Sequence, residues 1–342
     1  IALLPEDDKS HAAFLLGGWD PQTPGTGGVI LDDIAMLDLD SLKWSQCTNA
    51  NDEEVTIPGG PTSRHVAVPL SIKQSDNEDI RNVICLHNHR CEDHVLLLSS
   101  TTNGEESKSI CAQWERQPTK GDTPSSRGLH CAAPLNTSEG ISKGLVIFGG
   151  AAQSGSMSNE AFVLDLNTWS WTKLDCGDSD GIPSPRAGAC LCPLDENSVV
   201  LFGGATPSDG GLEGLNDVWV LHIDEEKGKG KWQCLISNDD KDESIVRPGG
   251  RNAATLSAVD IEKLLPNDII WKEATADNDK CTYFLLQVSY LLTVSLHSFQ
   301  KIADQTKNSL PLLRVVGILF RKHMTMYSCF AFRQTNVCIT LT

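Results

Sequence analysis

The motif Pro-x-x-Arg recurs four times along this chain of 342 residues, at nearly constant spacing. Its copies are Pro61-Thr62-Ser63-Arg64, Pro124-Ser125-Ser126-Arg127, Pro183-Ser184-Pro185-Arg186 and Pro248-Gly249-Gly250-Arg251. Successive arginines are 63, 59 and 65 residues apart. The fold is therefore expected to be an array of similar units of about sixty residues, each packing against the next.

Each unit contains the same elements in the same order. A hydrophobic run ends on Gly-Gly at residues 14–18, 146–150 and 200–204, and a segment that begins with an acidic residue follows at 33–38, 160–165 and 217–221. A tryptophan comes next, at Trp44, Trp114, Trp171 and Trp232. We interpret the unit as four short strands, because short apolar runs between turn signals are typical of strands. A four-stranded sheet stacked radially against its neighbours is a blade of a β-propeller.

This set of motifs resembles that of the kelch-repeat proteins over residues 11–260. The resemblance implies an all-β fold, a kelch-type β-propeller whose recognisable blades span about 11–48, 64–117, 127–174 and 186–235. The copy at 64–117 departs from the pattern, because His87-Asn88-His89 stands in place of Gly-Gly. The copy at 11–48 lacks a first strand, and an extra first strand is expected within 251–259. Either that strand closes the ring against the copy at 11–48, or the propeller is incomplete.

Residues 261–342 differ from the repeats in composition. They contain one glycine, Gly317, and one tryptophan, Trp271, and they lack Gly-Gly. The stretch 283–299 has no charged residue, but it is shorter and more polar than a membrane-spanning helix of about 20 apolar residues. Three accounts are open: degenerate strands that complete the ring, a helical cap, or residues that do not belong to the natural fold. We favour the last two, so a divergent, non-propeller tail is expected.

The charge balance restricts the class of partner. The chain carries 28 basic and 45 acidic residues, a formal net charge of −17. Such a charge repels phosphate backbones and acidic membrane surfaces, so neither nucleic acid nor a membrane is an expected partner. The 12 cysteines lack the spacing of a disulfide scaffold or a metal finger. Reduced thiols are expected, which favours a cytoplasmic location and is compatible with a nuclear one.

One cluster of candidate metal ligands lies in the copy that departs from the pattern, and it comprises Cys85, His87, His89, Cys91 and His94. Its spacing matches no zinc finger. Residues 85, 87 and 89 alternate onto one face of a strand, where they are too far apart in line to share one ion. We therefore expect a degenerate blade strand, with no metal and no cofactor.

The candidate binding residues are the arginines of the repeated motif, Arg64, Arg127, Arg186 and Arg251. Antiparallel strand order places them at one end of the blades, together with the long loops 19–32, 151–159 and 205–216. Some kelch proteins hold acidic peptide segments with arginines at this position, and the guanidinium fork suits carboxylates. Alternatively, each arginine pairs with an acidic residue or a carbonyl of the adjacent blade and only fixes the repeat. On the binding hypothesis, replacing Arg127 and Arg186 with Ala weakens partner capture and leaves the melting temperature nearly unchanged.

The sequence carries no recognisable catalytic signature. It contains no Gly-x-Ser-x-Gly, His-Glu-x-x-His or Gly-x4-Gly-Lys motif. The tyrosines Tyr283, Tyr290 and Tyr327 lie outside the repeats, which argues against the radical copper oxidases built on kelch-like propellers. We therefore expect a non-enzymatic interaction module, an adaptor or effector whose loop-rich face binds a partner protein through an acidic segment. The alternative is an enzyme of the sugar-acid isomerase type that acts in the central channel, because such sites are built from scattered residues.

Overall fold

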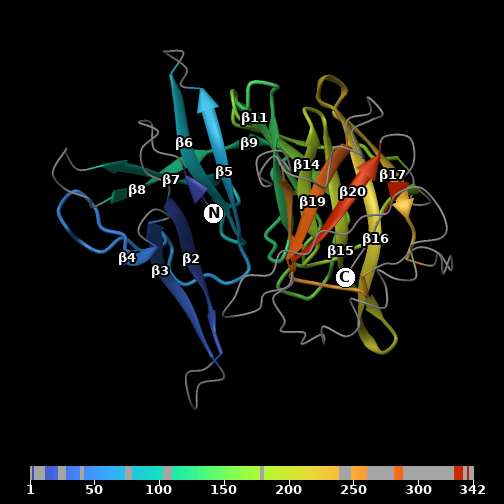
Figure 1. The fold of residues 1–342 in the computed structure, drawn as a ribbon, viewed down its shortest axis with the longest axis horizontal. Helices are drawn as coiled ribbons and strands as arrows, with labels where there is room; N and C mark the ends of the chain where they lie inside the picture. The colour runs from blue at the N-terminus through green and yellow to red at the C-terminus, as the bar shows by residue number, and fades with distance from the viewer. Residues whose placement is uncertain are drawn as a thin grey trace, which may run out of the picture.

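The computed structural model describes residues 2–3, 12–21, 28–38, 42–73, 79–102, 110–177, 181–238, 248–259, 281–287, 327–333 and 337–338. Within these ranges the regular elements are strands, apart from short 3-10 turns such as η2 (Glu225–Lys227). No helix in the described part of the chain is long and apolar enough to cross a membrane. The strands form five sheets. Figure 1 colours them from blue to red along the chain.

Four of these sheets coincide with the repeat units, and we call them blades 1 to 4. Blade 1 contains β1 (Ala2–Leu3), β2 (Ala12–Asp20), β3 (Val29–Asp38) and β4 (Lys43–Gln46). Blade 2 contains β5 (Val66–Lys73), β6 (Ile80–His87), β7 (His94–Thr102) and β8 (Ile110–Pro118). Blade 3 contains β10 (Cys131–Asn136), β11 (Ser142–Phe148), β12 (Ala161–Asp165) and β13 (Ser170–Lys173), with β9 (Lys120–Gly121) added in parallel at its outer edge. Blade 4 contains β14 (Cys190–Asp195), β15 (Ser198–Ser208), β16 (Gly211–Asp224) and β17 (Lys229–Ile236).

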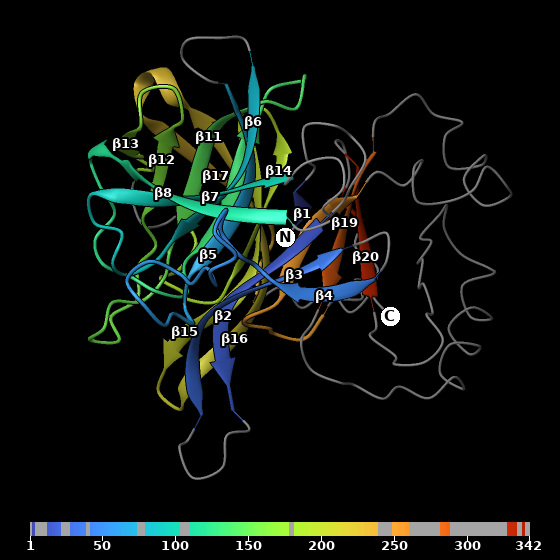
Figure 2. The same ribbon diagram turned by 90° about the vertical axis from the view of Figure 1, so that its left-hand side faces the viewer.

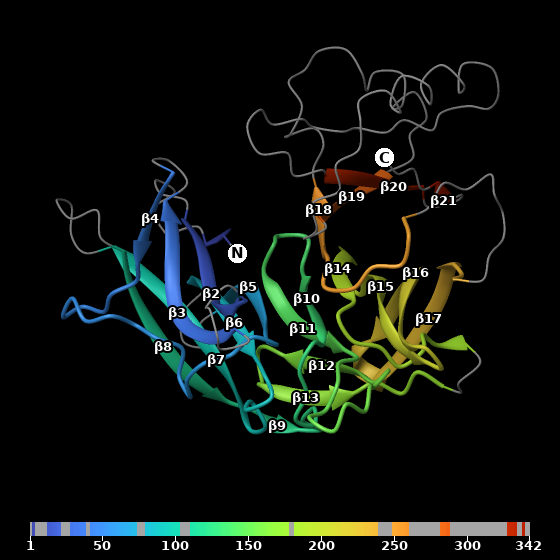
Figure 3. The same ribbon diagram turned by 90° about the horizontal axis from the view of Figure 1, so that it is seen from below.

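The blades stand side by side around a common centre. Figure 3 shows them in an arc, with the first strands of the units toward the middle. Strand β10 contacts both β5 and β14, and β14 in turn contacts β18 (Thr255–Val259) of the fifth sheet. This radial arrangement confirms the predicted all-β propeller of four-stranded blades.

The fifth sheet corrects the expectation for the C-terminal residues. Strand β18 pairs with β19 (Cys281–Gln287), which pairs with β20 (Tyr327–Arg333), and β21 (Val337–Cys338) completes the sheet. These three tail segments are strands, as the first of the three accounts expects, and not helices. Such a segment needs no Gly-Gly or Trp to form a strand, because aromatic and aliphatic residues suit any paired sheet position. The other residues between 260 and 342 lie outside the described part of the chain.

The first copy also differs from expectation. Its missing first strand is supplied by residues upstream of the predicted boundary, since Ala2 and Leu3 pair with Ala13 and Ala12. The extra strand expected within 251–259 is β18, and among the described strands it pairs with β19 rather than with a strand of the first copy.

The core lies between the blades, and the strand pattern explains why. In β11, Leu145 and Ile147 belong to the cluster shared with blade 2, whereas Val146 and Phe148 belong to the cluster shared with blade 4. All four side chains are fully buried, at 0% exposure. Because successive side chains of a strand point to opposite faces, a continuous apolar run marks a strand covered on both sides. Each such side chain contributes about 1.5 to 3 kcal/mol through burial.

Blade 1 is covered on one face only. Phe14 and Leu16 pack on blade 2, with 4% and 5% of their surface exposed. On the opposite face Leu15 and Trp44 remain 57% and 58% exposed. Leu37 lies beside Trp44 on this second face, because the two are direct cross-strand partners in β3 and β4. Blade 1 therefore stands at one end of the arc with an apolar face turned to solvent.

Candidate interaction face

The two repeated motifs meet at one end of the blades. The N–H of Gly150 donates a hydrogen bond of 2.9 Å to the carbonyl of Arg186, and that of Gly204 donates one of 2.8 Å to Arg251. The Gly-Gly turn of one blade is thereby tied to the Pro-x-x-Arg crossover of the next. Gly149 has φ +68°, and a Cβ there would lie 2.7 Å from the Arg186 carbonyl oxygen, so this approach requires glycine. Strand order had predicted that these connections share a face, and we call it the loop face.

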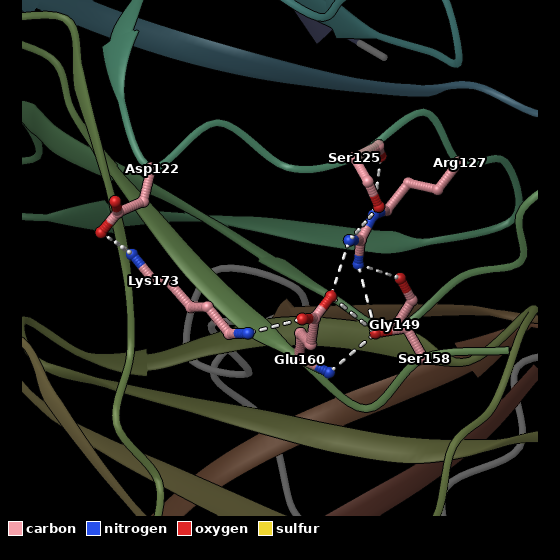
Figure 4. Close-up of polar contacts among 7 residues, drawn as sticks. All are labelled: Asp122, Ser125, Arg127, Gly149, Ser158, Glu160 and Lys173. Atoms are coloured by element: carbon pink, nitrogen blue, oxygen red, sulfur yellow. Dashed lines mark hydrogen bonds and ion pairs between the residues drawn. The ribbon is translucent and has the colours of Figure 1, made fainter.

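The side chain of Arg127 is used within its own blade, as Figure 4 shows. Its Nη2 donates to Glu160 Oε2 at 2.8 Å, and Nη1 donates to the carbonyl of Gly149 at 3.1 Å. Further bonds reach Ser125 and Ser158. The residue is 2% exposed. The guanidinium thus links the Pro-x-x-Arg segment, the Gly-Gly turn and Glu160, the residue that precedes β12.

Arg186 repeats this arrangement in blade 4. Its Nη1 and Nη2 donate to the two carboxylate oxygens of Asp217 at 2.6 and 2.8 Å, and Nη1 also donates to the carbonyl of Gly203 at 3.0 Å. Arg186 is 1% exposed. For Arg127 and Arg186 this geometry favours the hypothesis that the arginine stabilises the repeat over the hypothesis that it binds a partner. The acidic residue that pairs with each arginine lies in the same copy and not, as expected, in the adjacent blade. Glu160 directly precedes β12 and Asp217 lies within β16, and each is the first residue of the repeated segment of its unit, 160–165 or 217–221. This shared position was the signal in the sequence.

The other two arginines are placed differently. Arg64 is exposed, and no described residue accepts a hydrogen bond from its guanidinium. Arg90, in the turn between β6 and β7, donates instead to the carbonyls of Gly59, Gly60 and Pro61, in the connection from blade 1 to blade 2. Arg251 is partly buried and donates to the carbonyl of Gly249 at 2.8 Å. The four arginines therefore lie at the same end of successive units, but they do not form one exposed cationic ring.

Two of the predicted long loops are regular hairpins that project from the loop face (Figures 1 and 2). In blades 1 and 4 the pairing continues past Gly-Gly after a register shift, so that Trp19 pairs with Ile30 and Pro207 pairs with Leu212. A bulge of this kind bends a strand without ending it. The projecting parts carry exposed apolar side chains: Trp19 is 58%, Ile30 47% and Leu212 64% exposed. We call these two hairpins the arms.

The candidate metal ligands of blade 2 do not converge. His87 is buried and its Nδ1 lies 3.0 Å from His130 Nε2, whereas His94 contacts Asp93. Burial, with help from the nearby Arg127 charge, lowers the pKa of His87 to about 3. Burial raises the pKa of the Cys91 thiol to about 11. Among the described residues, no three His, Cys, Asp or Glu side chains are placed to hold a metal ion.

Comparison with known proteins supports the repeat assignment. A family model described as the KLHDC2/KLHL20/DRC7 kelch-repeats domain matches residues 106–261. The F-box/kelch-repeat protein At1g51550 of Arabidopsis thaliana is 32% identical over 140 residues, which cover 39% of this chain and 26% of that protein. Host cell factor of Drosophila melanogaster is 27% identical over 202 residues, which cover 57% of this chain and 12% of that protein.

A third relative is named as an enzyme. The tRNA wybutosine-synthesizing protein 4 of Emericella nidulans is 32% identical over 106 residues, which cover 30% of this chain and 10% of that protein. The chain thus spans about a quarter or less of the length of these three relatives. The matched segments, together with the repeated Gly-Gly and Pro-x-x-Arg geometry, show that this chain is a kelch-repeat protein with a kelch-type β-propeller.

Proposed function

We propose that this chain is a non-catalytic adaptor or effector module that docks a partner protein on its loop face, between the two arms. The kelch repeats and the relatives that share them support a protein interaction module. One observation carries the finer proposal: the arms hold large apolar side chains, Trp19, Ile30 and Leu212, out in solvent at the same end of the molecule.

Such side chains suit a binding surface. An exposed Trp beside an exposed Ile loses little conformational entropy on binding and buries a large area, which is why aromatic anchors dominate interface energetics. The arms are antiparallel ribbons rooted in blades 1 and 4, so these anchors are presented by regular structure rather than by irregular loops.

The proposed acidic segment of the partner contacts Arg64 and Arg251, the two arginines that the blades leave at least partly exposed. Arg64 lies next to Leu129, whose N–H donates to the Arg64 carbonyl and whose side chain is 38% exposed. A cation can bind the carboxylate of an acidic side chain while the neighbouring apolar side chain contacts its methylene groups. Arg127 and Arg186 support this face from within, because they fix the turns that surround it.

The described residues offer no arrangement that favours the sugar-acid isomerase alternative. The strongly shifted titratable groups among them are buried histidines and thiols, and Glu160, which ion pairs hold in the blade. Nine cysteines of the blades, from Cys47 to Cys234, are free thiols, which supports the proposal of a reducing compartment such as the cytoplasm or nucleus.

The test compares partner capture from native extract by the wild-type chain and two tryptophan variants, with quantitative mass spectrometry. Trp19→Ala removes an anchor of the first arm, and Trp44→Ala is the matched control, since both side chains are 58% exposed but Trp44 lies on β4. We expect Trp19→Ala to lower capture of a specific partner at least tenfold, and Trp44→Ala to leave it unchanged. Equal capture by all three proteins contradicts the proposal.

A further inference from the structure

A groove crosses the loop face above blade 3, between two successive crossovers. Its volume is about 790 Å³. One wall is the segment 122–127 that enters blade 3, and the other comprises residues 174–177 and Ile182, which lead toward blade 4. Its floor includes Ala161 and Phe162 at the start of β12. A hollow with an apolar floor and polar walls is the usual form of a recognition site.

The charges on the floor of the groove neutralise one another. Glu160 accepts hydrogen bonds from Lys173 Nζ at 2.6 Å and from Arg127 Nη2 at 2.8 Å, as Figure 4 shows. Partial burial alone would raise the pKa of Glu160, but the bonds from Lys173 and Arg127 outweigh it and hold the pKa at about 2. Glu160 is therefore ionised and paired, and neither cation is left to attract an anion.

The walls carry the charge that remains. Asp122 and Asp175 are exposed, and each accepts only a backbone N–H, Asp122 from Lys173 at 3.4 Å and Asp175 from Gly177 at 3.2 Å. No Lys, Arg or His of the described residues lies within ion-pair distance of either carboxylate. The groove thus presents two uncompensated negative charges over an apolar floor.

The groove continues toward the rim of blade 4. A second hollow of about 460 Å³ shares Asp175, Cys176 and Gly177 with it and reaches Lys229 and Lys231 at the start of β17. This hollow is also lined by Asp224, whose carboxylate pairs with Lys227 Nζ at 2.6 Å. The two hollows together offer a path for an extended segment, with Asp122 and Asp175 at the blade 3 end and a net positive charge from Lys229 and Lys231 at the blade 4 end. This polarity disfavours a uniformly basic or uniformly acidic occupant.

We infer that this groove binds an extended segment of the partner protein that places a Lys or Arg side chain against Asp122 and Asp175, with an acidic residue toward Lys229 and Lys231. The inference rests on the proposed interaction function and adds a second contact, which starts on the loop face and runs along the outer edge of blade 4. The aliphatic stem of the basic side chain lies on the floor around Phe162, and its charge meets the wall carboxylates. The complementarity fixes the direction of the segment in the groove, because reversing it brings like charges together.

The experiment measures binding of fluorescent synthetic peptides to the full chain by anisotropy at low and high salt. The probes are an extended peptide with Lys near one end and Asp near the other, the same peptide with acetyl-lysine, and an all-acidic peptide. The protein variants are Asp122→Asn with Asp175→Asn, and the control Asp195→Asn. Asp195 is also exposed and also accepts a backbone N–H from the residue two positions on, but it is the last residue of β14 and does not line the groove.

We expect the Lys-containing peptide to bind the wild type, to lose at least fivefold in affinity for the double variant, and to weaken with salt. Affinity for the Asp195→Asn control should not change. Acetyl-lysine should weaken binding as much as the double variant does. Absence of binding to the wild type, equal binding of the all-acidic peptide, or equal affinity for the double variant and the control each overturns the inference. Capture that depends on Trp19 would survive such a failure, so the groove and the arms are tested separately.

Discussion

Arg186 and Asp217 form a two-pronged ion pair that is almost completely removed from water. The two N–O distances are 2.6 and 2.8 Å, and the side chains are 1% and 6% exposed. The indole N–H of Trp219 donates to the same carboxylate at 2.7 Å. Every strong donor or acceptor of the pair therefore has a partner, and removing one member leaves a buried charge without compensation.

Arg186→Ala should destabilise the protein by about 3 kcal/mol or more, because Asp217 would remain buried and unpaired. Arg64→Ala, the control in an exposed position, should change the free energy of unfolding by less than about 0.5 kcal/mol. Urea denaturation followed by tryptophan fluorescence measures both values. If the two variants unfold at the same urea concentration, the structural role of Arg186 is refuted.

Arg127→Ala should cost less than Arg186→Ala, about 1 to 2 kcal/mol, because Glu160 is partly solvated and keeps Lys173 as a partner. The side chain of Glu160 is 35% exposed. A second readout is the pKa of the Glu160 carboxyl, which should rise from about 2 when the Arg127 bond is lost. An NMR titration of the Glu160 carboxyl carbon checks this. An unchanged pKa would mean that Lys173 alone holds the carboxylate.

Gly149→Ala should be much more damaging than Gly155→Ala. Both residues have positive φ, +68° and +86°, so the backbone strain is similar. A Cβ at Gly149 would lie 2.7 Å from the Arg186 carbonyl oxygen, whereas nothing lies within 4 Å of one at Gly155. We expect Gly155→Ala to cost about 1 kcal/mol and Gly149→Ala at least about 2 kcal/mol more. Thermal unfolding of the two variants in parallel decides the point; equal melting temperatures argue against the close approach.

Stability should fall as the pH drops from 7 to 5. His87 is neutral in the folded protein, with a pKa of about 3, whereas in the unfolded chain it titrates near 6.5. Below pH 6.5 the unfolded state binds a proton that the folded state does not, so stability is lost progressively down to about pH 3. The loss between pH 7 and 5 is about 2 kcal/mol for this group.

His130 has its pKa lowered in the same direction by burial and by His87, and it should add to the effect. The depressed pKa of Glu160 acts at lower pH, because stability from a carboxylate is lost only below its unfolded value. The measurement is the urea midpoint at several pH values for the wild type and for His87→Leu. A variant that loses stability between pH 7 and 5 as steeply as the wild type contradicts the assignment.

Blades 3 and 4 were predictable because all their signals agree. In β11 and β15 a continuous apolar run precedes Gly-Gly. The regular spacing of the Pro-x-x-Arg motifs then shows where each copy begins. The partner of Arg186 was visible too, since Asp217 stands at the same place in its unit as Glu160. The spacing of the motifs does not reveal which strand ends lie close together. The acidic partner of each arginine was therefore expected in the adjacent blade, whereas Asp217 lies in the same copy as Arg186.

Two other features were hidden for physical reasons. Gly203 and Gly204 suggest the end of a strand, but in blade 4 the register shifts at Gly203 and the ladder resumes at Gly204. Whether a chain turns or continues after such a bulge depends on residues further along the hairpin. The strand β19 lacks every repeat marker, and its place depends on pairing with β18 and β20, which local patterning does not encode.

The one-sided burial of blade 1 affects how the molecule comes apart. In this structure blade 1 packs on a single neighbouring blade, so fraying is expected to start there while the blades packed on both faces stay closed. The arm that presents Trp19 is rooted in this unit, whereas the arm of blade 4 is rooted in a sheet packed on both faces. A ligand that binds both arms would link blade 1, the least stable part of the array, to blade 4, one of the most stable. It would therefore raise the protection from hydrogen exchange of the amides of β2 and β3 more than that of the amides of β15 and β16.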